Sequence, residues 1–330
     1  MEKIRIGVIG CSQIAQNSVI PAIKKSQYAE LEFIGSRNNK KAKKFAEKFN
    51  CRNFGCYQDV FDSKNVDAVY VSTPVGLHEK WSIKSMKNQK HVLCEKSISD
   101  SYKSAKKMMK SASENNVRLM EGMMFRFHPS HKIIKNFIKK YLGETYAFYG
   151  RYGFPPISKN NIRYDKKLGG GIINDAVCYP ICASRIIFQK EPKTVFSTVE
   201  IEPESKIDER VAVTLNFDEH HNAHMVCGYN LGYQNSYSVW GEKGTINLSR
   251  SFNIPPKMKP NIEITSDKIS KKIKTESANH FVLMIDAFCK NILKKTVENF
   301  EKELLQQAKI MEGVRLSSKQ RKAITLSQIK

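Results

Sequence analysis

The first residues whose types and spacing suit ligand binding lie in the turn after the first apolar segment. Residues 4–9 alternate and then run apolar, as a buried parallel strand does. Directly after them, Gly10-x-Ser12-x-x-Ala15 is a variant of the Gly-x-Gly-x-x-Gly/Ala turn that holds a dinucleotide pyrophosphate at a helix start. We therefore expect pyrophosphate contacts from four successive positions of the turn and helix: Gly10, Ser12, Gln13 and Ile14. The alternative is a tight strand–helix turn that binds no ligand.

Each position of this turn has a physical requirement. Gly10 allows the tight turn, a small residue at position 12 lets the backbone approach a phosphate, and Ala15 permits close helix–strand packing. Ser12 departs from the usual glycine, although it is still small and its hydroxyl can donate to a phosphate. The motif alone is weakly specific, but here it follows a strand and opens a helix, which is the required context.

The segment after the second predicted strand sets the choice of dinucleotide. An acidic residue there binds the ribose 2′-hydroxyl of NAD. Residues 35–41 read Gly-Ser-Arg-Asn-Asn-Lys-Lys and contain no carboxylate. Ser36 and Arg37 can hold a 2′-phosphate, with Lys41 nearby, so the sequence favours NADP over NAD. The alternative is that Arg37 only stacks on the adenine.

These motifs require elements that place them, and the N-terminal part predicts an alternation of strands and helices. Such short-spaced alternation indicates βαβ units and a parallel sheet. The expected strands are 4–9, 31–35, 66–72, 91–94 and 117–120, and the expected helices are about 13–26, 39–49, 79–88 and 99–115. We expect residues 1–122 to form a Rossmann dinucleotide-binding domain of the α/β class.

The pattern changes after Glu121 to long strand-like segments. We expect residues 123–330 to form an α+β domain for substrate binding and oligomerisation, with an open, mostly antiparallel sheet. Residues 218–222 are expected to be a hairpin tip. The remaining expected elements are helices at 131–141, 281–294 and 300–317 and strands at 145–152, 194–201, 210–217, 223–229, 237–240 and 245–248.

Composition excludes several classes of protein. The 330 residues are 41% hydrophobic, as in a globular enzyme, and we find no run of about 18 apolar residues that would span a membrane. The net charge of +23 is spread over several helices without a nucleic-acid-binding motif, so solvated lysine-rich faces explain it best. The N-terminus shows no signal peptide, and a cytoplasmic location is expected.

We expect no metal site. The eight cysteines form no Cys-x-x-Cys pair, and they are interpreted as small core residues or free thiols. Cys178 and Cys182 share a helix face but have no partners at ligand spacing. A hairpin tip explains His220, His221 and His224 better than a metal cluster does.

Further segments resemble one known family when they are taken together in chain order. They are Val71-Ser72-Thr73-Pro74 with His78, Cys94-Glu95-Lys96, residues 121–129 (Glu-Gly-Met-Met-Phe-Arg-Phe-His-Pro), Gly169–Asp175 with Tyr179, and Trp240–Thr245. With the first turn, this set is similar to the glucose–fructose oxidoreductase / inositol dehydrogenase / MocA (Gfo/Idh/MocA) family, from Ile4 to about Leu248. The set is specific, although each piece alone is not.

The resemblance implies a dinucleotide-binding domain followed by a domain with an open antiparallel sheet, paired in a homodimer or homotetramer. It implies that Thr73, Pro74 and His78 lie along the cofactor, and that Glu95 and Lys96 lie at the nicotinamide. Ser97 stands where the family commonly has proline. Many members have histidine at the position of Tyr179. The glucose–fructose oxidoreductase and dihydrodiol dehydrogenase branches have tyrosine there, as this chain does, which weakens any transfer of inositol dehydrogenase chemistry.

The residues singled out suit hydride transfer between nicotinamide and a carbinol or ketone carbon. A free phenol has a pKa of about 10, and a neighbouring ammonium such as that of Lys96 lowers it. We expect Tyr179 to move the proton of the substrate oxygen while Lys96 hydrogen-bonds that oxygen. Asp175 is one helical turn before Tyr179 and can orient Lys96 or a substrate hydroxyl.

Three further residues are assigned by their positions in these motifs. Arg126 follows the last strand of the first domain and touches either the cofactor or the substrate, or else forms an inter-domain salt bridge. Arg163 and Tyr164 precede the glycine run and are expected to line the substrate site. The expected substrate is a sugar, a sugar derivative or a nucleotide sugar. The alternative function is a non-catalytic, dinucleotide-sensing regulator on the same scaffold.

Overall fold

The computed structural model describes residues 2–330 and divides into two compact units. The first contains the described residues up to Met124 together with Phe281–Leu305, and the second contains Phe125–His280 and Gln306–Lys330. This division differs from the expected one at residue 122, because a late segment of the chain groups with the first unit.

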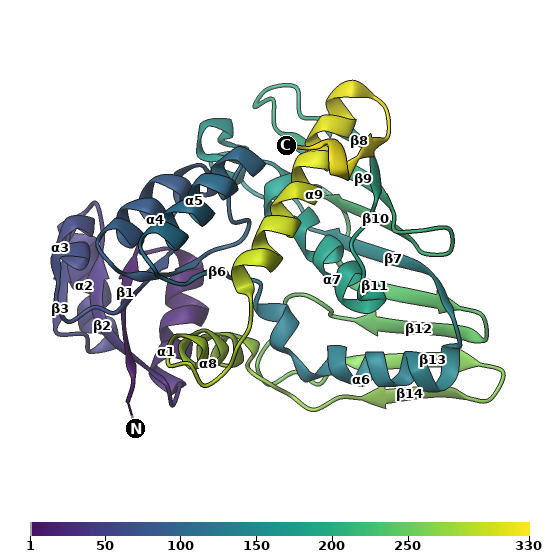
Figure 1. The fold of residues 1–330 in the computed structure, drawn as a ribbon, viewed down its shortest axis with the longest axis horizontal. Coiled ribbons are helices and arrows are strands. Elements are labelled where there is room, and N and C mark those ends of the chain that lie inside the picture. Colours follow the sequence, from purple (N-terminus) through teal and green to yellow (C-terminus); the bar gives the residue numbers. More distant parts are fainter. Residues whose placement is uncertain (1) are drawn as a thin grey trace. The chain divides into compact units, whose positions relative to one another are not determined.

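A six-stranded parallel sheet in the order β3-β2-β1-β4-β5-β6 forms the centre of the first unit (Figure 1). This order and direction are those of a Rossmann fold, in which the strand order reverses beside the first strand. The predicted fold class is thereby confirmed for this unit. The strands are β1 (Ile4–Ile9), β2 (Ala29–Gly35), β3 (Asn53–Gly55), β4 (Ala68–Val71), β5 (His91–Cys94) and β6 (Leu119–Glu121).

The helices of the first unit follow the predicted alternation closely. After Gln13 and Ile14 the first helix has a π-helical stretch, η1 (Ala15–Val19), before α1 (Ile20–Lys25). The others are α2 (Asn39–Phe49), α3 (Tyr57–Asp62), α4 (His78–Lys87), α5 (Tyr102–Glu114) and α8 (His280–Ile292). The sequence did not indicate β3 or α3, because three residues of strand and six of helix are too short to show a period.

Side-chain contacts explain why residues 281–305 belong to the first unit. The Ser26 hydroxyl donates to the Asp286 carboxylate of α8. Arg118, which precedes β6, forms an ion pair with Glu301 at 2.6 Å between Nε and Oε1. The expected assignment of this whole stretch to the second domain is corrected accordingly.

The second unit is built on a nine-stranded, mostly antiparallel sheet in the order β14-β13-β12-β11-β7-β10-β9-β8-β15. One pair, β7 with β10, is parallel. The predicted open, mostly antiparallel sheet is confirmed. Its strands are β7 (Thr145–Gly153), β8 (Thr194–Ile201), β9 (Asp208–Asn216), β10 (Asn222–Gly228), β11 (Gln234–Gly241), β12 (Gly244–Ser249), β13 (Asn261–Ser266), β14 (Ser270–Lys274) and β15 (Ile324–Thr325).

Three of these strands, β13, β14 and the two-residue β15, were not expected. In β13, Ile262 and Ile264 alternate with exposed residues and are buried, so the signal was present but short. The next strand, β14, ends the sheet and contains three lysines in five residues. Lysines on an edge strand oppose pairing with another chain. The hairpin tip predicted between β9 and β10 is confirmed, since Asn216 pairs with Asn222.

Helix α7 (Cys178–Phe188) lies against the sheet of the second unit. A Cβ atom on Gly150 of β7 would lie 2.5 Å from Pro180 Cβ, so glycine is required for this close approach. Within the described residues, the helical segment Lys166–Phe188 is long and apolar enough to cross a membrane, yet 83% of its most apolar window is buried, as in a core helix. Further helices are α6 (Pro129–Phe137) with η4 (Ile138–Leu142), and α9 (Phe300–Gln320).

Candidate active site

The turn after β1 has the geometry that a phosphate-binding turn needs. Gly10 has φ +93°, which disfavours any residue with a side chain. A Cβ atom there would also lie 2.4 Å from the backbone oxygen of Ser72, at the end of β4. Two strand ends therefore approach each other closely at Gly10. The turn fits a dinucleotide, because it has the tight glycine conformation at Gly10 and is followed by the N–H groups of the first helix turn.

Ser12 makes contacts that differ from those of the usual glycine. Its Oγ accepts the backbone N–H of Ala15 at 3.1 Å and shares a short hydrogen bond with the Ser72 hydroxyl. The side chain thus caps the start of the helix and links it to the end of β4. Either hydroxyl can be the donor of that bond, so Ser12 can still donate to a phosphate when Ser72 supplies the hydrogen. The backbone N–H groups of Gln13 and Ile14 are further donors.

The end of β2 presents cations and no carboxylate, as the sequence indicated. Ser36 is 6% exposed, and its N–H donates to the Gly55 carbonyl at 2.9 Å. Burial raises the pKa of the Tyr57 hydroxyl, and the nearby Arg37 guanidinium acts in the opposite direction. The charge of Lys41 acts on Cys11, and burial raises the pKa of that thiol. These groups suit a 2′-phosphate better than a bare ribose.

His78 is fully buried and contacts backbone rather than an open surface. Its Nε2 lies 2.8 Å from the carbonyl oxygen of Thr73, and its Nδ1 lies 2.9 Å from that of Ser97. The ring therefore joins the Thr73-Pro74 turn to the segment after β5. Burial lowers the pKa of His78, while the two carbonyls raise it. Any effect of His78 on a bound cofactor must pass through these two segments.

Lys96 follows β5, at the edge of the sheet where the parallel strands end. The neighbouring Glu95 carboxylate accepts the Tyr70 hydroxyl at 2.6 Å. Removal from water raises the pKa of Glu95, and the Tyr70 hydroxyl and the Lys96 ammonium lower it. Gly10, Thr73 and Lys96 thus follow β1, β4 and β5, three adjacent strands of one sheet. Ligands of open α/β sheets bind at this edge.

In the second unit, Asp175 has a partner that the sequence did not indicate. Arg163 Nε donates to Asp175 Oδ2 at 2.5 Å, and the buried Tyr229 hydroxyl donates to the same oxygen at 3.3 Å. The carboxylate raises the pKa of the Arg163 guanidinium. The helix start beneath them is fixed by Asp208, whose carboxylate accepts the N–H of Ile173 at 2.6 Å. Asp175 is thus oriented by its own unit, one turn before Tyr179.

The Tyr179 ring is held inside an aromatic cluster of the second unit. Its centroid lies 5.2 Å from that of Tyr152, 5.7 Å from Phe252 and 5.8 Å from Phe125. The residue is 5% exposed. Such packing fixes the direction of the side chain, which suits a group that must present a hydroxyl in one orientation.

Tyr164 and Arg126 occupy less informative positions. Tyr164 is 6% exposed, and its hydroxyl lies 3.5 Å from the Glu209 carboxylate, so its contacts are those of a structural residue. Arg126 is half-buried in a 3₁₀ turn, Met124–Phe127. Both assignments from the sequence stay predictions.

No group of three or more metal-ligating side chains occurs in residues 2–330. In the β9–β10 hairpin, the backbone of His220 and His221 forms hydrogen bonds that shape the turn. Asp218 Oδ1 accepts the backbone N–H groups of His220 and His221, both at 2.9 Å. His224 instead lies in β10, with its ring stacked on Tyr149 at 5.5 Å between centroids.

Comparison with known proteins agrees with this geometry over most of the chain. Residues 4–123 match the oxidoreductase family with an NAD-binding Rossmann fold, and residues 132–247 match the GFO/IDH/MocA C-terminal domain. An uncharacterized oxidoreductase of Rhizobium meliloti is 30% identical over 78% of this chain and 77% of its own.

One relative and one solved structure match almost end to end. A dTDP-3,4-didehydro-2,6-dideoxy-alpha-D-glucose 3-reductase of Saccharopolyspora spinosa is 29% identical over 94% of this chain and 96% of its own. The crystal structure of a 3-ketoreductase from Actinomadura kijaniata, in complex with NADP and TDP-benzene, superposes with a TM-score of 0.92 at 28% identity. That superposition covers 96% of this chain and 98% of the other.

Proposed function

Because the chain belongs to the Gfo/Idh/MocA family of oxidoreductases, we propose that this NAD(P)-dependent enzyme interconverts a ketone and a carbinol on a nucleotide-linked sugar, with NADP(H) as its preferred cofactor. The observation that carries this proposal is the end-to-end likeness to nucleotide-sugar 3-reductases, which includes both units. The cations at the end of β2 support the choice of NADP.

The residues have distinct roles in this proposal. The bound nicotinamide supplies or accepts the hydride. Gly10, Gln13 and Ile14 hold the pyrophosphate, and Ser36, Arg37 and Lys41 hold the adenosine end. Tyr179 gives a proton to the substrate oxygen or takes one from it. Lys96 donates a hydrogen bond to that oxygen and stabilises its negative charge.

Asp175 serves these roles indirectly. Its carboxylate is engaged by Arg163 and Tyr229, so it is not a free base. We propose that the Arg163–Asp175 pair holds the first turn of the helix that presents Tyr179, and that Arg163, with a 42% exposed side chain, also contacts the substrate.

The cofactor preference is tested by replacing Arg37 with methionine. We expect the affinity for NADPH to fall by about 10- to 100-fold, the range of a lost charge-assisted hydrogen bond of about 1.5–3 kcal/mol, while the affinity for NADH stays nearly unchanged. Fluorescence titration with both dinucleotides measures this. Arg52→Met is the control, because Arg52 precedes β3, whereas Arg37 follows β2, the strand that pairs with it. Equal losses for NADPH and NADH would instead show that Arg37 stacks on the adenine.

The substrate class is tested by incubating the enzyme and NADPH with a dTDP-linked keto-sugar and with the same keto-sugar lacking the nucleotide. We expect NADPH oxidation with the first and much slower oxidation with the second. Equal rates would show that the nucleotide is not recognised. The regulator alternative is disfavoured, because the matching relatives are named oxidoreductases.

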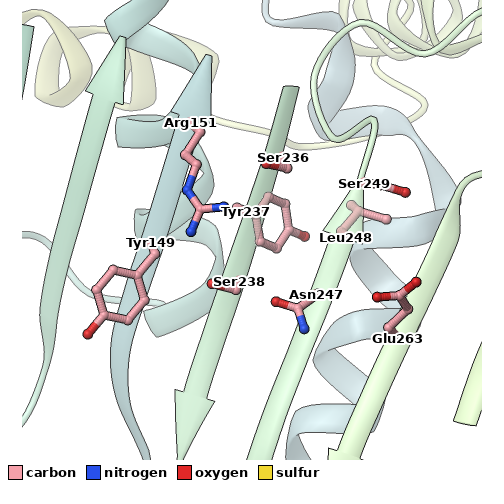
Figure 2. Close-up of a pocket in the computed structure, with 9 residues that line it drawn as sticks. All are labelled: Tyr149, Arg151, Ser236, Tyr237, Ser238, Asn247, Leu248, Ser249 and Glu263. Carbon is pink, nitrogen blue, oxygen red and sulfur yellow. The ribbon is translucent and has the colours of Figure 1, made fainter. Parts of the chain in front are cut away.

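We also propose that the enzyme is a homodimer or homotetramer that pairs through the sheet of the second unit. A hollow of about 220 Å³ on this sheet is lined from four adjacent strands by polar side chains that include Arg151, Ser238, Asn247 and Glu263 (Figure 2). Trp240 and Val226 lie in the same sheet, 53% and 50% exposed. Exposed large apolar side chains within a polar surface are typical of protein interfaces.

Replacing an exposed apolar side chain of this sheet with a carboxylate tests the proposed pairing. We expect Trp240→Glu to convert an oligomer into a monomer in light scattering, because a buried carboxylate at an interface is costly. Phe54→Glu is the control, since Phe54 is 39% exposed in the first unit. A wild-type protein that runs as a monomer would contradict the proposal. The cytoplasmic location stays a prediction.

A further inference from the structure

The segment around Lys96 is held by side chains from three other elements of the first unit, two of which bond its backbone and one the Glu95 side chain. The residues on either side of this lysine, Glu95, Ser97 and Ile98, each form a hydrogen bond with a buried or nearly buried side chain. Lys96 itself lies between these three fixed points. All of the groups concerned belong to the first unit.

The three bonds come from different directions. Tyr70, in β4 and fully buried, donates its hydroxyl to Glu95 Oε1 at 2.6 Å. His78, at the start of α4, contacts the Ser97 carbonyl at 2.9 Å. Glu121, the last residue of β6 and 7% exposed, accepts the N–H of Ile98 at 2.8 Å through Oε1.

Burying a glutamate costs free energy unless its carboxylate forms hydrogen bonds or ion pairs, so the buried position of Glu121 requires an explanation. One oxygen of Glu121 accepts the backbone N–H of Ile98, after the end of β5, which would otherwise be buried without this hydrogen bond. The next residue, Gly122, reinforces the contact: its N–H donates to the Cys94 carbonyl at 2.7 Å. A Cβ atom at Gly122 would lie 3.3 Å from that carbonyl oxygen, closer than most side chains approach. The end of β6 is thereby fitted closely against the segment that bears Lys96.

We propose that Tyr70, His78 and Glu121 are positioning residues that fix the segment bearing Lys96 for catalysis, Tyr70 through the Glu95 side chain and the other two through backbone groups. None of the three needs to touch substrate or cofactor. His78 also contacts the Thr73 carbonyl at 2.8 Å, so the same group of side chains sets the Lys96 segment relative to the Thr73-Pro74 turn. The consequence for catalysis rests on the proposed function, in which Lys96 acts on the substrate oxygen.

The test compares two substitutions of Glu121. Glu121→Gln keeps an oxygen that can accept the Ile98 N–H, whereas Glu121→Leu has a similar size and no acceptor. We expect Glu121→Leu to lower kcat by about 10²-fold, the effect of a small misplacement of a catalytic group, with little change in NADPH affinity. Glu121→Gln should keep kcat near that of the wild type. Tyr70→Phe, which removes only one hydroxyl, should lower kcat in the same direction by a smaller factor.

The matched control is Asp67→Leu. Asp67 Oδ2 accepts the N–H of Arg5 at 2.8 Å, the same kind of bond, but at the edge of the sheet where the strands begin. We expect this variant to lose thermal stability and to keep kcat at temperatures where it is folded. The proposal is overturned if Glu121→Leu keeps the wild-type kcat, if Asp67→Leu loses as much kcat, or if Glu121→Gln is as impaired as Glu121→Leu.

A second measurement separates this proposal from the proposed function. Amide hydrogen exchange of the peptide that contains Ile98 needs no substrate and can be followed by mass spectrometry without cofactor. Exchange there should be faster in Glu121→Leu than in the wild type, and unchanged in Asp67→Leu. If no sugar is turned over but exchange responds in this way, the proposed substrate is wrong and the positioning is right. Unchanged exchange in Glu121→Leu overturns the positioning.

Discussion

Tyr179→Phe is expected to lower kcat by about 10²- to 10⁴-fold, the usual contribution of a positioned proton donor or acceptor. The affinity for NADPH should hardly change, because Tyr179 lies in the second unit and the residues assigned to the dinucleotide turn and the end of β2 lie in the first. The measurements are initial rates of NADPH oxidation and a fluorescence titration of NADPH.

The substitution removes one hydroxyl and keeps the ring that packs against Tyr152 and Phe252. A large loss of stability is therefore not expected. Tyr237→Phe is the control: it removes a buried hydroxyl that lies 2.9 Å from His131 Nδ1 in the same unit. That variant should lose stability but not kcat. A Tyr179→Phe enzyme with wild-type kcat would show that another group moves the proton.

Lys96→Met is expected to lower kcat by about 10²- to 10³-fold, the cost of removing one donor to a developing oxyanion. Methionine keeps the length and apolar stem of lysine but has no ammonium. The loss should appear in kcat rather than in NADPH affinity, since the charge on the substrate oxygen develops during the reaction. Initial rates at saturating NADPH measure it.

Lys90→Met is the control for this second variant. Lys90 is 9% exposed, and its ammonium donates to the carbonyls of Ser63 and Val66 in the same unit. Its replacement should reduce the melting temperature and leave kcat unaltered at temperatures where the enzyme is folded. If Lys96→Met were to retain full turnover, Lys96 would be a structural residue and the catalytic assignment would be wrong.

The sequence predicted the first unit well, because the patterns that identify its strands, turns and helices each lie within a few consecutive residues. The apolar run of β1, Gly10 and the helix after it occur within a dozen residues, and each has a direct physical meaning. The absence of a carboxylate after β2 was equally visible, and the structure adds only that the Arg37 guanidinium acts to lower the pKa of the buried Tyr57 hydroxyl, against the effect of burial. In the second unit, the spacing of Asp175 and Tyr179 correctly indicated that they lie one helical turn apart.

The contacts that orient the site were not predictable, because they join residues distant in sequence. Tyr70 reaches Glu95, His78 reaches Ser97, and Glu121 reaches Ile98 across about twenty residues each. A buried tyrosine in an apolar strand gives no sign of its partner. The ion pair between Arg163 and Asp175 was missed for a similar reason, since the glycine run between them hides the turn that brings them together.

The central claim, hydride transfer to a nucleotide-linked sugar, is tested most directly by following the transferred hydrogen. The enzyme is incubated with a dTDP-linked keto-sugar and NADPH that is deuterated at its transferable position, and the sugar product is analysed by mass spectrometry and NMR. One deuterium on the carbon that becomes the carbinol is the expected result, and Tyr179→Phe should form far less of this labelled product in the same time. A product without deuterium, or deuterium found only on a free sugar, would contradict the account.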